Sequence, residues 1–272
     1  MTKTFLYIFL VGYFLSLIVF AQDTAEKYFK IGNGKLKQEY YTEAIEAYTK
    51  AIEIYSKEAD SYKKTSNDKV RVTDYTGAIE EYTKVIELKP SLAFAYFNRG
   101  VAKANSKDID GAMQDFTEVI EINPNFADAY YNRALAKTQR QEIEDAVKDL
   151  NKATELAPAD VKSFYLRGNL KANLSDFPGA IEDYSKTIEL KPDLAPAYYN
   201  RGNVKANLGD LNGAVLDYTK AIELKPDFAF AYNNRGKIKY SLNDKNGACS
   251  DWKKAEELGD RETKDLINKF CQ

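Results

Sequence analysis

The sequence predicts an all-α solenoid made of antiparallel helix pairs, and three periodic features predict it. Alanine recurs with a step of 34 residues, at Ala44, Ala78, Ala112, Ala146, Ala180, Ala214 and Ala248. A large side chain follows each alanine by four residues, at Tyr48, Tyr82, Phe116, Leu150, Tyr184, Tyr218 and Trp252. Proline recurs with the same step, at Pro90, Pro124, Pro158, Pro192 and Pro226. A fixed period of this length indicates stacked units that each pack against their neighbours.

The unit that begins at Ala195 shows why each repeat forms two helices. Its pattern predicts a first helix from Ala195 to Leu208, which Gly209 ends because glycine tolerates the left-handed conformation that closes a helix. A second periodic stretch follows and ends at Pro226. The recurring alanine, here Ala214, predicts a close approach of two helices, where a larger side chain costs about 1–3 kcal/mol.

The second helices need residues that cap their amino termini. We expect side-chain caps of this kind at Thr42, Thr76, Asp110, Asn212 and Asn246. Asp227, directly after Pro226, is placed to cap the first helix of the next unit.

The stretch AYYNRGNVKANLGDLNGAVLDYTKAIELKPD, from Ala197 to Asp227, resembles the tetratricopeptide repeat. The resemblance covers residues 25–262 and implies a right-handed superhelix of helix pairs with a concave groove. Seven repeats are expected, at 25–58, 59–92, 93–126, 127–160, 161–194, 195–228 and 229–262. Residues 263–272 are expected to form a capping helix, in which Leu266, Ile267 and Phe270 cover the last repeat.

Repeat 2 departs from the pattern in its first helix. Its segment SYKKTSNDKVRV, residues 61–72, keeps the register but is very polar and has Ser66 where other repeats carry a glycine or an alanine. Two interpretations remain open, a poorly packed helix that acts as a hinge and a solvated loop.

The first 21 residues resemble an export signal. Lys3 gives a positive start, Phe5 to Phe20 form an apolar run, and Val19 and Ala21 are small residues before a cleavage site. We expect cleavage before Gln22 and a periplasmic or extracellular protein without a membrane span after cleavage. An uncleaved amino-terminal anchor is the alternative.

The composition excludes several classes of function. The chain of 272 residues has 39 Lys and Arg against 41 Asp and Glu, and this balance argues against nucleic acid as the main ligand. It contains no histidine, which removes Ser-His-Asp, Cys-His and His-metal chemistry. Since no phosphate loop or metal-ligand spacing occurs either, we expect no enzymatic activity, no cofactor and no metal.

Positions within a repeat are counted from 1 to 34, with position 1 at residues 25, 59, 93, 127, 161, 195 and 229. Position 7 is an arginine whenever position 23 is an aspartate, and position 11 is lysine in every repeat. We predict structural Arg–Asp pairs between the two helices of a repeat: Arg99–Asp115, Arg133–Asp149, Arg167–Asp183, Arg201–Asp217 and Arg235–Asp251. An anion-binding site is the alternative interpretation.

The opposite side of each first helix carries amides and aromatic rings. Position 6 holds Asn98, Asn132, Asn200 and Asn234, and position 9 adds Asn169 and Asn203. Position 5 holds Phe97, Tyr131, Tyr165 and Tyr199. Because an amide both donates and accepts, such a row can bind the backbone of an extended peptide, and tyrosines supply rigid contact area. It resembles the asparagine ladder of some tetratricopeptide superhelices.

The two cysteines lie near the carboxyl terminus. An exported chain meets an oxidising compartment, so Cys249 and Cys271 are candidates for a disulfide that holds the capping helix. Two free thiols are the alternative.

Together these features predict a non-catalytic scaffold that binds a protein or an extended peptide in its groove. A structural subunit of an envelope complex, which uses the convex face or the edges, is the alternative.

Overall fold

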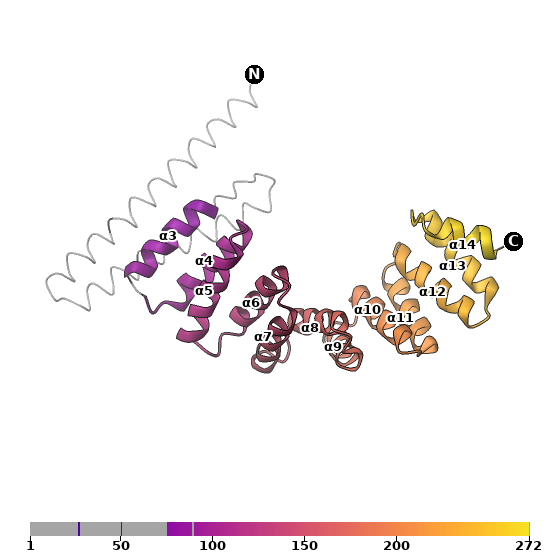
Figure 1. Cartoon of the computed structure of the whole chain (residues 1–272), viewed down its shortest axis with the longest axis horizontal. Helices are drawn as coiled ribbons and strands as arrows, with labels where there is room; N and C mark the ends of the chain where they lie inside the picture. The colour runs from indigo at the N-terminus through magenta and orange to yellow at the C-terminus, as the bar shows by residue number, and fades with distance from the viewer. Residues whose placement is uncertain (1–26, 28–49, 51–74, 89, 272) are drawn as a thin grey trace, which may run out of the picture. The chain divides into compact units, whose positions relative to one another are not determined.

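The computed structural model describes residues 75–88 and 90–271, together with Lys27 and Lys50 (Figure 1). The chain divides into two units, residues 1–74 and 75–272, and the fold and site below belong to the second. The predicted signal segment, the body of repeat 1 and the first helix of repeat 2 lie outside the described residues.

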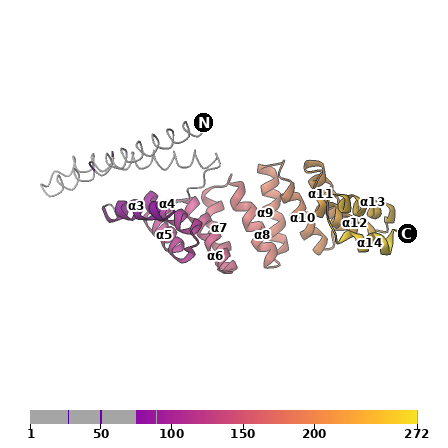
Figure 2. The same ribbon diagram turned by 90° about the horizontal axis from the view of Figure 1, so that it is seen from above.

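Every regular element of the described residues is an α-helix, and consecutive helices pack in pairs (Figures 1 and 2). The helices are α3 (Tyr75–Leu88), α4 (Ala93–Asn105), α5 (Ile109–Ile122), α6 (Ala127–Gln139), α7 (Ile143–Leu156), α8 (Val161–Asn173), α9 (Phe177–Leu190), α10 (Ala195–Asn207), α11 (Leu211–Leu224), α12 (Ala229–Ser241), α13 (Lys245–Glu257) and α14 (Thr263–Phe270). In each of repeats 3 to 7 the first helix packs most extensively against the second, and the second then packs against the first helix of the next repeat or, in repeat 7, against α14. The predicted all-α solenoid is therefore confirmed.

The recurring alanine and the large residue after it form the core of repeats 3 to 7. Ala112, Ala146, Ala180, Ala214 and Ala248 are all fully buried. Position 8 is matched to the large side chain at position 24. A Cβ on Gly202 would lie 2.9 Å from the Tyr218 ring, and one on Gly236 would lie 2.6 Å from the Trp252 ring. Repeat 4 has alanine at position 8 because it faces the smaller Leu150, in the same cluster.

The amino-terminal caps predicted at position 18 are wrong wherever the structure describes them. In four repeats the cap is an aspartate two residues earlier, which accepts a hydrogen bond from the backbone N–H three residues on. These caps are Asp108, Asp176, Asp210 and Asp244, bonded at 2.9–3.1 Å to Gly111, Gly179, Gly213 and Gly247. The second helix starts directly after this aspartate, which leaves the residues at position 18 in its first turn.

The described residues that were predicted as caps lie inside helices or away from the cap position. Asp110 and Asn212 lie inside α5 and α11, Asn246 lies inside α13, and Thr76 lies inside α3. The residue before α12 is Phe228, not Asp227, and it makes no side-chain cap. Thr42 lies outside the described residues.

In repeats 3 to 7 the first helix ends two residues before a residue in the left-handed conformation. Gly209 has φ +83°, as the glycine predicts. The same position carries side chains in the other repeats: Lys107, Gln141, Ser175 and Asn243, with φ between 61° and 70°. The turn therefore keeps one geometry although only one of these repeats has the residue that adopts it without strain.

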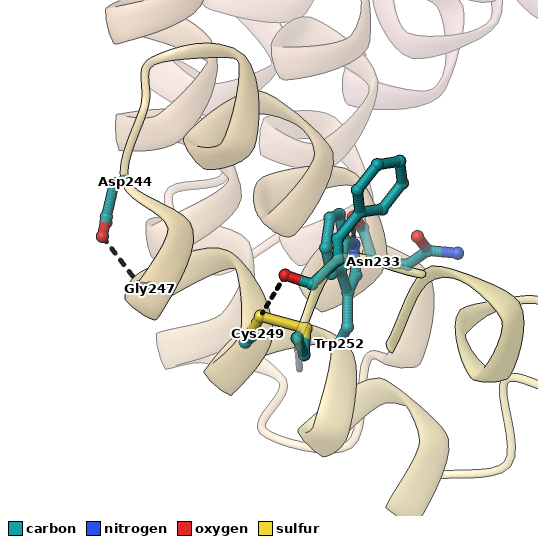
Figure 3. Close-up of a disulfide and its surroundings, with 7 residues drawn as sticks. Asn233, Asp244, Gly247, Cys249 and Trp252 are labelled. Carbon is teal, nitrogen blue, oxygen red and sulfur yellow. Dashed lines mark hydrogen bonds between the residues drawn. A yellow bond between two sulfur atoms is a disulfide. The ribbon is translucent and has the colours of Figure 1, made fainter. Parts of the chain in front are cut away.

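The carboxyl-terminal helix α14 is held to the last repeat by covalent, aromatic and polar contacts. Cys249 of α13 forms a disulfide with Cys271, the residue after α14 (Figure 3). The Phe270 ring lies 4.6 Å from the Tyr240 ring and 6.0 Å from that of Trp252, between centroids. The buried Asn233 side chain donates to Asp260, just before α14, at 2.6 Å.

Candidate functional site

The arginine at position 7 makes a bidentate ion pair with the aspartate at position 23 of its own repeat. In the repeat of α10 and α11, Arg201 Nε donates to Asp217 Oδ2 at 2.9 Å and Nη2 donates to Oδ1 at 2.7 Å. The four other predicted pairs have the same arrangement: Arg99–Asp115, Arg133–Asp149, Arg167–Asp183 and Arg235–Asp251. The structure thus brings together all ten residues that the pattern pairs.

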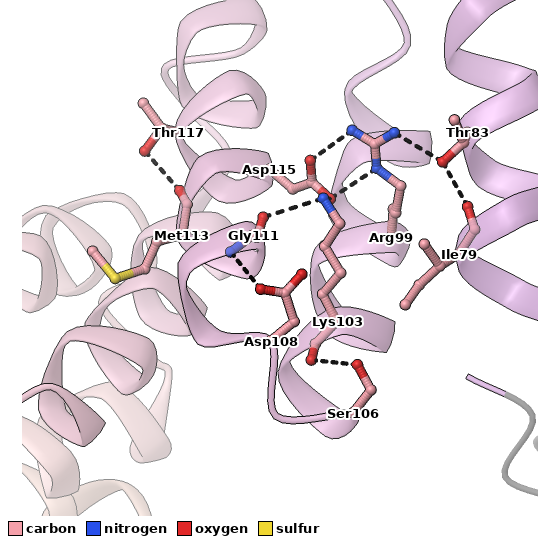
Figure 4. A network of polar contacts seen from close by, with 10 residues as sticks. All are labelled: Ile79, Thr83, Arg99, Lys103, Ser106, Asp108, Gly111, Met113, Asp115 and Thr117. Carbon is pink, nitrogen blue, oxygen red and sulfur yellow. Dashed lines mark hydrogen bonds and ion pairs between the residues drawn. The ribbon is translucent and has the colours of Figure 1, made fainter. Parts of the chain in front are cut away.

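The lysine at position 11 also pairs with this aspartate, a contact that the sequence analysis missed. Lys205 Nζ lies 2.8 Å from Asp217 Oδ2, and Lys103 Nζ lies 3.0 Å from Asp115 Oδ2 (Figure 4). The aspartate side chains are 1–7% exposed, so each buried carboxylate is matched by two cations. The hydrogen bonds that Arg99 donates to Asp115, together with the charge of Asp115, raise the pKa of Arg99 above its usual value.

The same arginine also reaches the preceding repeat. Arg99 Nη1 donates to the Thr83 hydroxyl of α3 at 3.0 Å (Figure 4). Likewise, Arg201 Nη1 donates to the Ser185 hydroxyl of α9 at 3.0 Å. The partners are position-25 residues of the preceding repeat, Thr83, Thr117, Asn151, Ser185 and Thr219, and Arg167 adds Thr154. The small polar residues at position 25 were a visible signal for this contact. One guanidinium therefore links three helices, which identifies the row as a structural element.

The amides at positions 6 and 9 form cross-links between repeats 5, 6 and 7. Asn200 Nδ2 donates to Asn169 Oδ1 at 2.9 Å and to the Tyr165 hydroxyl at 3.0 Å. One repeat later, Asn234 Nδ2 donates in the same way to Asn203 Oδ1 at 3.0 Å and to the Tyr199 hydroxyl at 3.1 Å. Both Nδ2 hydrogens of Asn200 and Asn234 are used within the protein.

Two buried tyrosines complete these networks, and the sequence analysis had not assigned them a polar role. The Tyr184 and Tyr218 hydroxyls donate to Asn169 Oδ1 and Asn203 Oδ1, both at 2.8 Å. Burial raises the pKa of both tyrosines well above the usual value. Each of these two asparagine oxygens therefore accepts two hydrogen bonds, which fixes the orientation of the amide.

The asparagines of repeats 3 and 4 behave differently. Asn98 Nδ2 donates to the Phe94 carbonyl at 2.9 Å, and Asn132 Nδ2 donates to the Asp128 carbonyl at 2.8 Å, each within its own helix. In the networks above, the acceptor is position 9 of the preceding repeat. For Asn132 this residue is Val101, which has no amide to accept the bond, and for Asn98 it is Asn67, which lies outside the described residues. The predicted row of equivalent asparagines is thus two sets with different bonding.

The aromatic residues at position 5 pack partly against the core. The Tyr199 ring lies 5.9 Å from that of Tyr218 and 4.8 Å from that of Phe228, and Tyr165 lies 6.1 Å from Tyr184, between ring centroids. Phe97 packs on Phe116 and Phe126 at 5.9 and 5.0 Å, and Lys162 Nζ lies 5.1 Å above the Tyr131 ring. All four position-5 rings, Phe97, Tyr131, Tyr165 and Tyr199, remain partly exposed.

An open cavity of about 340 Å³ lies beside the second amide network. Its lining comes from α10, α11 and α12: Asn203, Ala206, Asn207, Tyr218, Asn234, Lys237 and Ile238. Lys237 is the one charged residue among them, and its side chain is exposed. The sequence analysis missed Lys237, although position 9 changes there from amide to cation.

Two searches of the described residues define what this part of the chain lacks. It contains no group of three or more carboxylates and cysteines arranged to hold a metal ion. None of its helices has the length and apolar character needed to cross a membrane.

Family models of the tetratricopeptide repeat match several segments of the chain. Two models described as tetratricopeptide repeat match residues 93–126 and 195–228, and residues 25–58 and 127–160. A third, described as TPR repeat, matches residues 173–209. Together the matches cover more than half of the 272 residues.

Solved structures of repeat proteins have the same fold. The MamA protein is 26% identical with a TM-score of 0.59, over 63% of this chain and 94% of MamA. YrrB, described as a TPR protein with an unusual peptide-binding site, is 22% identical with a TM-score of 0.65, over 70% of this chain and 99% of YrrB. The carboxyl-terminal part of a TPR repeat-containing protein from Cytophaga hutchinsonii is 19% identical with a TM-score of 0.60, over 68% of this chain and 74% of that one.

A search of curated proteins returned no match. The repeat models and the solved structures agree with the helix pairs described above. The chain therefore belongs to the tetratricopeptide repeat family.

Proposed function

We propose that this protein is a non-catalytic scaffold that binds an extended peptide segment of a partner protein. The site is the amide face, defined as the side of the first helices that carries Asn98, Asn132, Asn169, Asn200, Asn203 and Asn234. The observation that carries the proposal is the open cavity on this face, which is lined by three of the chain's asparagines and one tyrosine. YrrB, a repeat protein of the same fold, is itself described as having a peptide-binding site.

The bonding within the amide face changes how a peptide would be held. Asn200 and Asn234 use their Nδ2 hydrogens inside the protein, and within the described residues no donor reaches their Oδ1 atoms. These oxygens accept hydrogen bonds from peptide N–H groups. Asn98 and Asn132 keep one N–H and one oxygen each and serve both peptide groups. The tyrosine networks hold the amides rigid, which lowers the entropic cost of binding.

A panned library of displayed random peptides tests the proposal. The variant carries Asn132→Ala and Asn207→Ala, since neither side chain bonds to another repeat. We expect it to bind a selected peptide about tenfold more weakly, the loss of about two hydrogen bonds, with an unchanged Tm. Unchanged affinity would place the peptide elsewhere and contradict the proposal.

A second candidate function, a structural subunit that assembles through an edge, has its own observation. Leu174, Leu208 and Leu242 occupy position 14 of three successive repeats and are 38%, 50% and 41% exposed. Because they stand at the same turn in each repeat, they form an apolar row along one edge. A variant in which Leu174, Leu208 and Leu242 are all replaced by serine tests this edge, as the variant with Asn132→Ala and Asn207→Ala tests the amide face. If that variant alone lost assembly with an envelope complex, the edge would be the functional surface.

We further propose that the chain is exported and matures by cleavage before Gln22. The apolar segment Phe5 to Phe20 supports this location, and so does the Cys249–Cys271 disulfide, because such bonds persist in oxidising compartments. The mass of the mature amino terminus tests it, since an intact Met1 would contradict cleavage.

A further inference from the structure

The residue at position 9 changes its chemistry from one end of the described repeats to the other. From α4 to α12 it is Val101, Leu135, Asn169, Asn203 and Lys237. The first two are apolar, the next two are amides, and the last is a cation. At position 9 the amide face is therefore apolar in repeats 3 and 4 and polar in repeats 5 to 7, and the one charge at this position lies in the last repeat.

Lys237 differs from the lysines two residues further along the first helices. All of the described position-11 lysines, among them Lys239, pair with the buried aspartate of their own repeat. Lys237 makes no ion pair with any residue that the structure describes, and no acidic residue lines its cavity. Its charge is exposed at the mouth of a pocket without a compensating carboxylate.

Of the other donors of the cavity, Asn203 is oriented by the network behind it. Asn203 Oδ1 accepts from the Tyr218 hydroxyl and from Asn234, so its Nδ2 group is left for a ligand. Asn207 lies one turn further along α10, is exposed, and lines the same cavity. An ammonium and two amide N–H groups around one cavity form a site for a carboxylate.

An apolar surface lies on the same helix face as the cation. Phe230 precedes Lys237 by seven residues, two turns of α12, and therefore points to the same side of the helix. Its side chain is 61% exposed and is therefore open to a ligand. Asn234 lies between them on this face. The order along α12 is thus ring, amide and ammonium.

We propose that this cavity binds the side-chain carboxylate of an aspartate or glutamate in the partner peptide, with an apolar side chain of the same peptide on Phe230. The proposal rests on the peptide-binding function above and specifies its ligand. At the corresponding place between repeats 5 and 6, position 9 of repeat 6 is Asn203 and not a lysine. The acidic residue is therefore read at the pair of repeats 6 and 7 and not at the pair before it.

The experiment compares the peptides that three proteins select from one displayed library of random peptides. The proteins are the whole mature chain, its Lys237→Gln variant, and the control Lys253→Gln, which removes an exposed lysine of α13 away from the cavity. We expect the unmodified chain and the control to enrich peptides with an acidic residue next to an apolar one, and Lys237→Gln to lose the acidic preference.

Affinities of one selected peptide then give the size of the effect. Replacing its acidic residue by the corresponding amide should weaken binding to the unmodified chain about fivefold at physiological salt, as expected for one exposed ion pair, and leave binding to Lys237→Gln unchanged. Selection of peptides without an acidic preference, or a preference that survives Lys237→Gln, overturns the carboxylate site and leaves peptide binding intact. If no peptide is enriched by any of the proteins, the peptide-binding function itself is overturned.

Discussion

Arg201 and Asp217 are joined by two parallel hydrogen bonds, although they lie sixteen residues apart on the two helices of one repeat. Arg201 also donates to Ser185 of the repeat before, and Asp217 also pairs with Lys205. The nearly buried carboxylate of Asp217 is therefore paired with two cations, Arg201 and Lys205. This arrangement recurs in five repeats and gives a direct test of what holds neighbouring repeats together.

Removing the arginine should destabilise the fold. Arg201→Met leaves Asp217 buried with Lys205 as its one cation, and we expect a loss of about 2 kcal/mol in the free energy of unfolding, measured with urea. Adding Asp217→Leu should restore part of this loss because the buried charge is gone. Arg140→Met is the control, since Arg140 is 45% exposed in its ion pairs. If Arg201→Met had unchanged or increased stability, the pair would specify how the two helices align and would not stabilise the fold.

A glycine should stabilise the turn of repeat 4. Gln141 has φ 63° and an exposed side chain, and a residue with a Cβ is strained in this conformation. Gln141→Gly is expected to raise the free energy of unfolding by about 1 kcal/mol. The reverse change at the equivalent position, Gly209→Ala, should lower it by a similar amount. Equal stability of all three proteins in urea would show that the strain is relieved elsewhere.

The buried tyrosines should make the protein sensitive to alkali. Burial raises the pKa of Tyr184 and Tyr218 in the folded chain above the unfolded value of 10.0, so the folded state holds these protons more tightly. The stability that this provides is complete below the unfolded pKa and is lost as pH rises above it.

Tyr218→Phe tests the assignment. It should cost about 1 kcal/mol near neutral pH, because Asn203 loses one donor, and should make unfolding less dependent on pH above about 10. Urea unfolding at several pH values measures both effects. Tyr198→Phe, which removes the hydroxyl of a partly exposed ring of α10, serves for comparison. An alkaline slope that is the same in Tyr218→Phe as in the parent would contradict the prediction.

Reduction of the disulfide should loosen the carboxyl-terminal cap. The bond joins residues separated by 22 positions, and its loss is expected to lower stability by about 3 kcal/mol in the loop-entropy model. Trp252 is the only tryptophan of the chain and lies beside Phe270, so its fluorescence reports on the cap directly. The double variant Cys249→Ser and Cys271→Ser should not respond to reductant. A Trp252 signal that is constant on reduction would show that Asn233 and Phe270 hold the cap alone.

The repeat period predicted the helix pairs because the alanine at position 20 and the large side chain at position 24 carry the packing in repeats 3 to 7. The Arg–Asp pairs could be predicted for a similar reason. An arginine stands at position 7, as Arg201 does, only in the repeats that have an aspartate at position 23, as Asp217 does. The caps could not, because Asp210 and Asn212 are both good cap residues and only the true start of α11 separates them. The amide networks could not either, because they depend on which neighbour the Asn200 and Asn234 side chains reach.

The two links of each arginine also bear on how such a chain can grow. Arg201 finds Asp217 within its own repeat and Ser185 in the repeat before, both sixteen residues away. A tandem duplication of any such 34-residue unit therefore delivers a new arginine together with its carboxylate, while the older copy supplies the hydroxyl. The number of repeats can change by whole units during evolution or by engineering, and no buried charge is left without its partner.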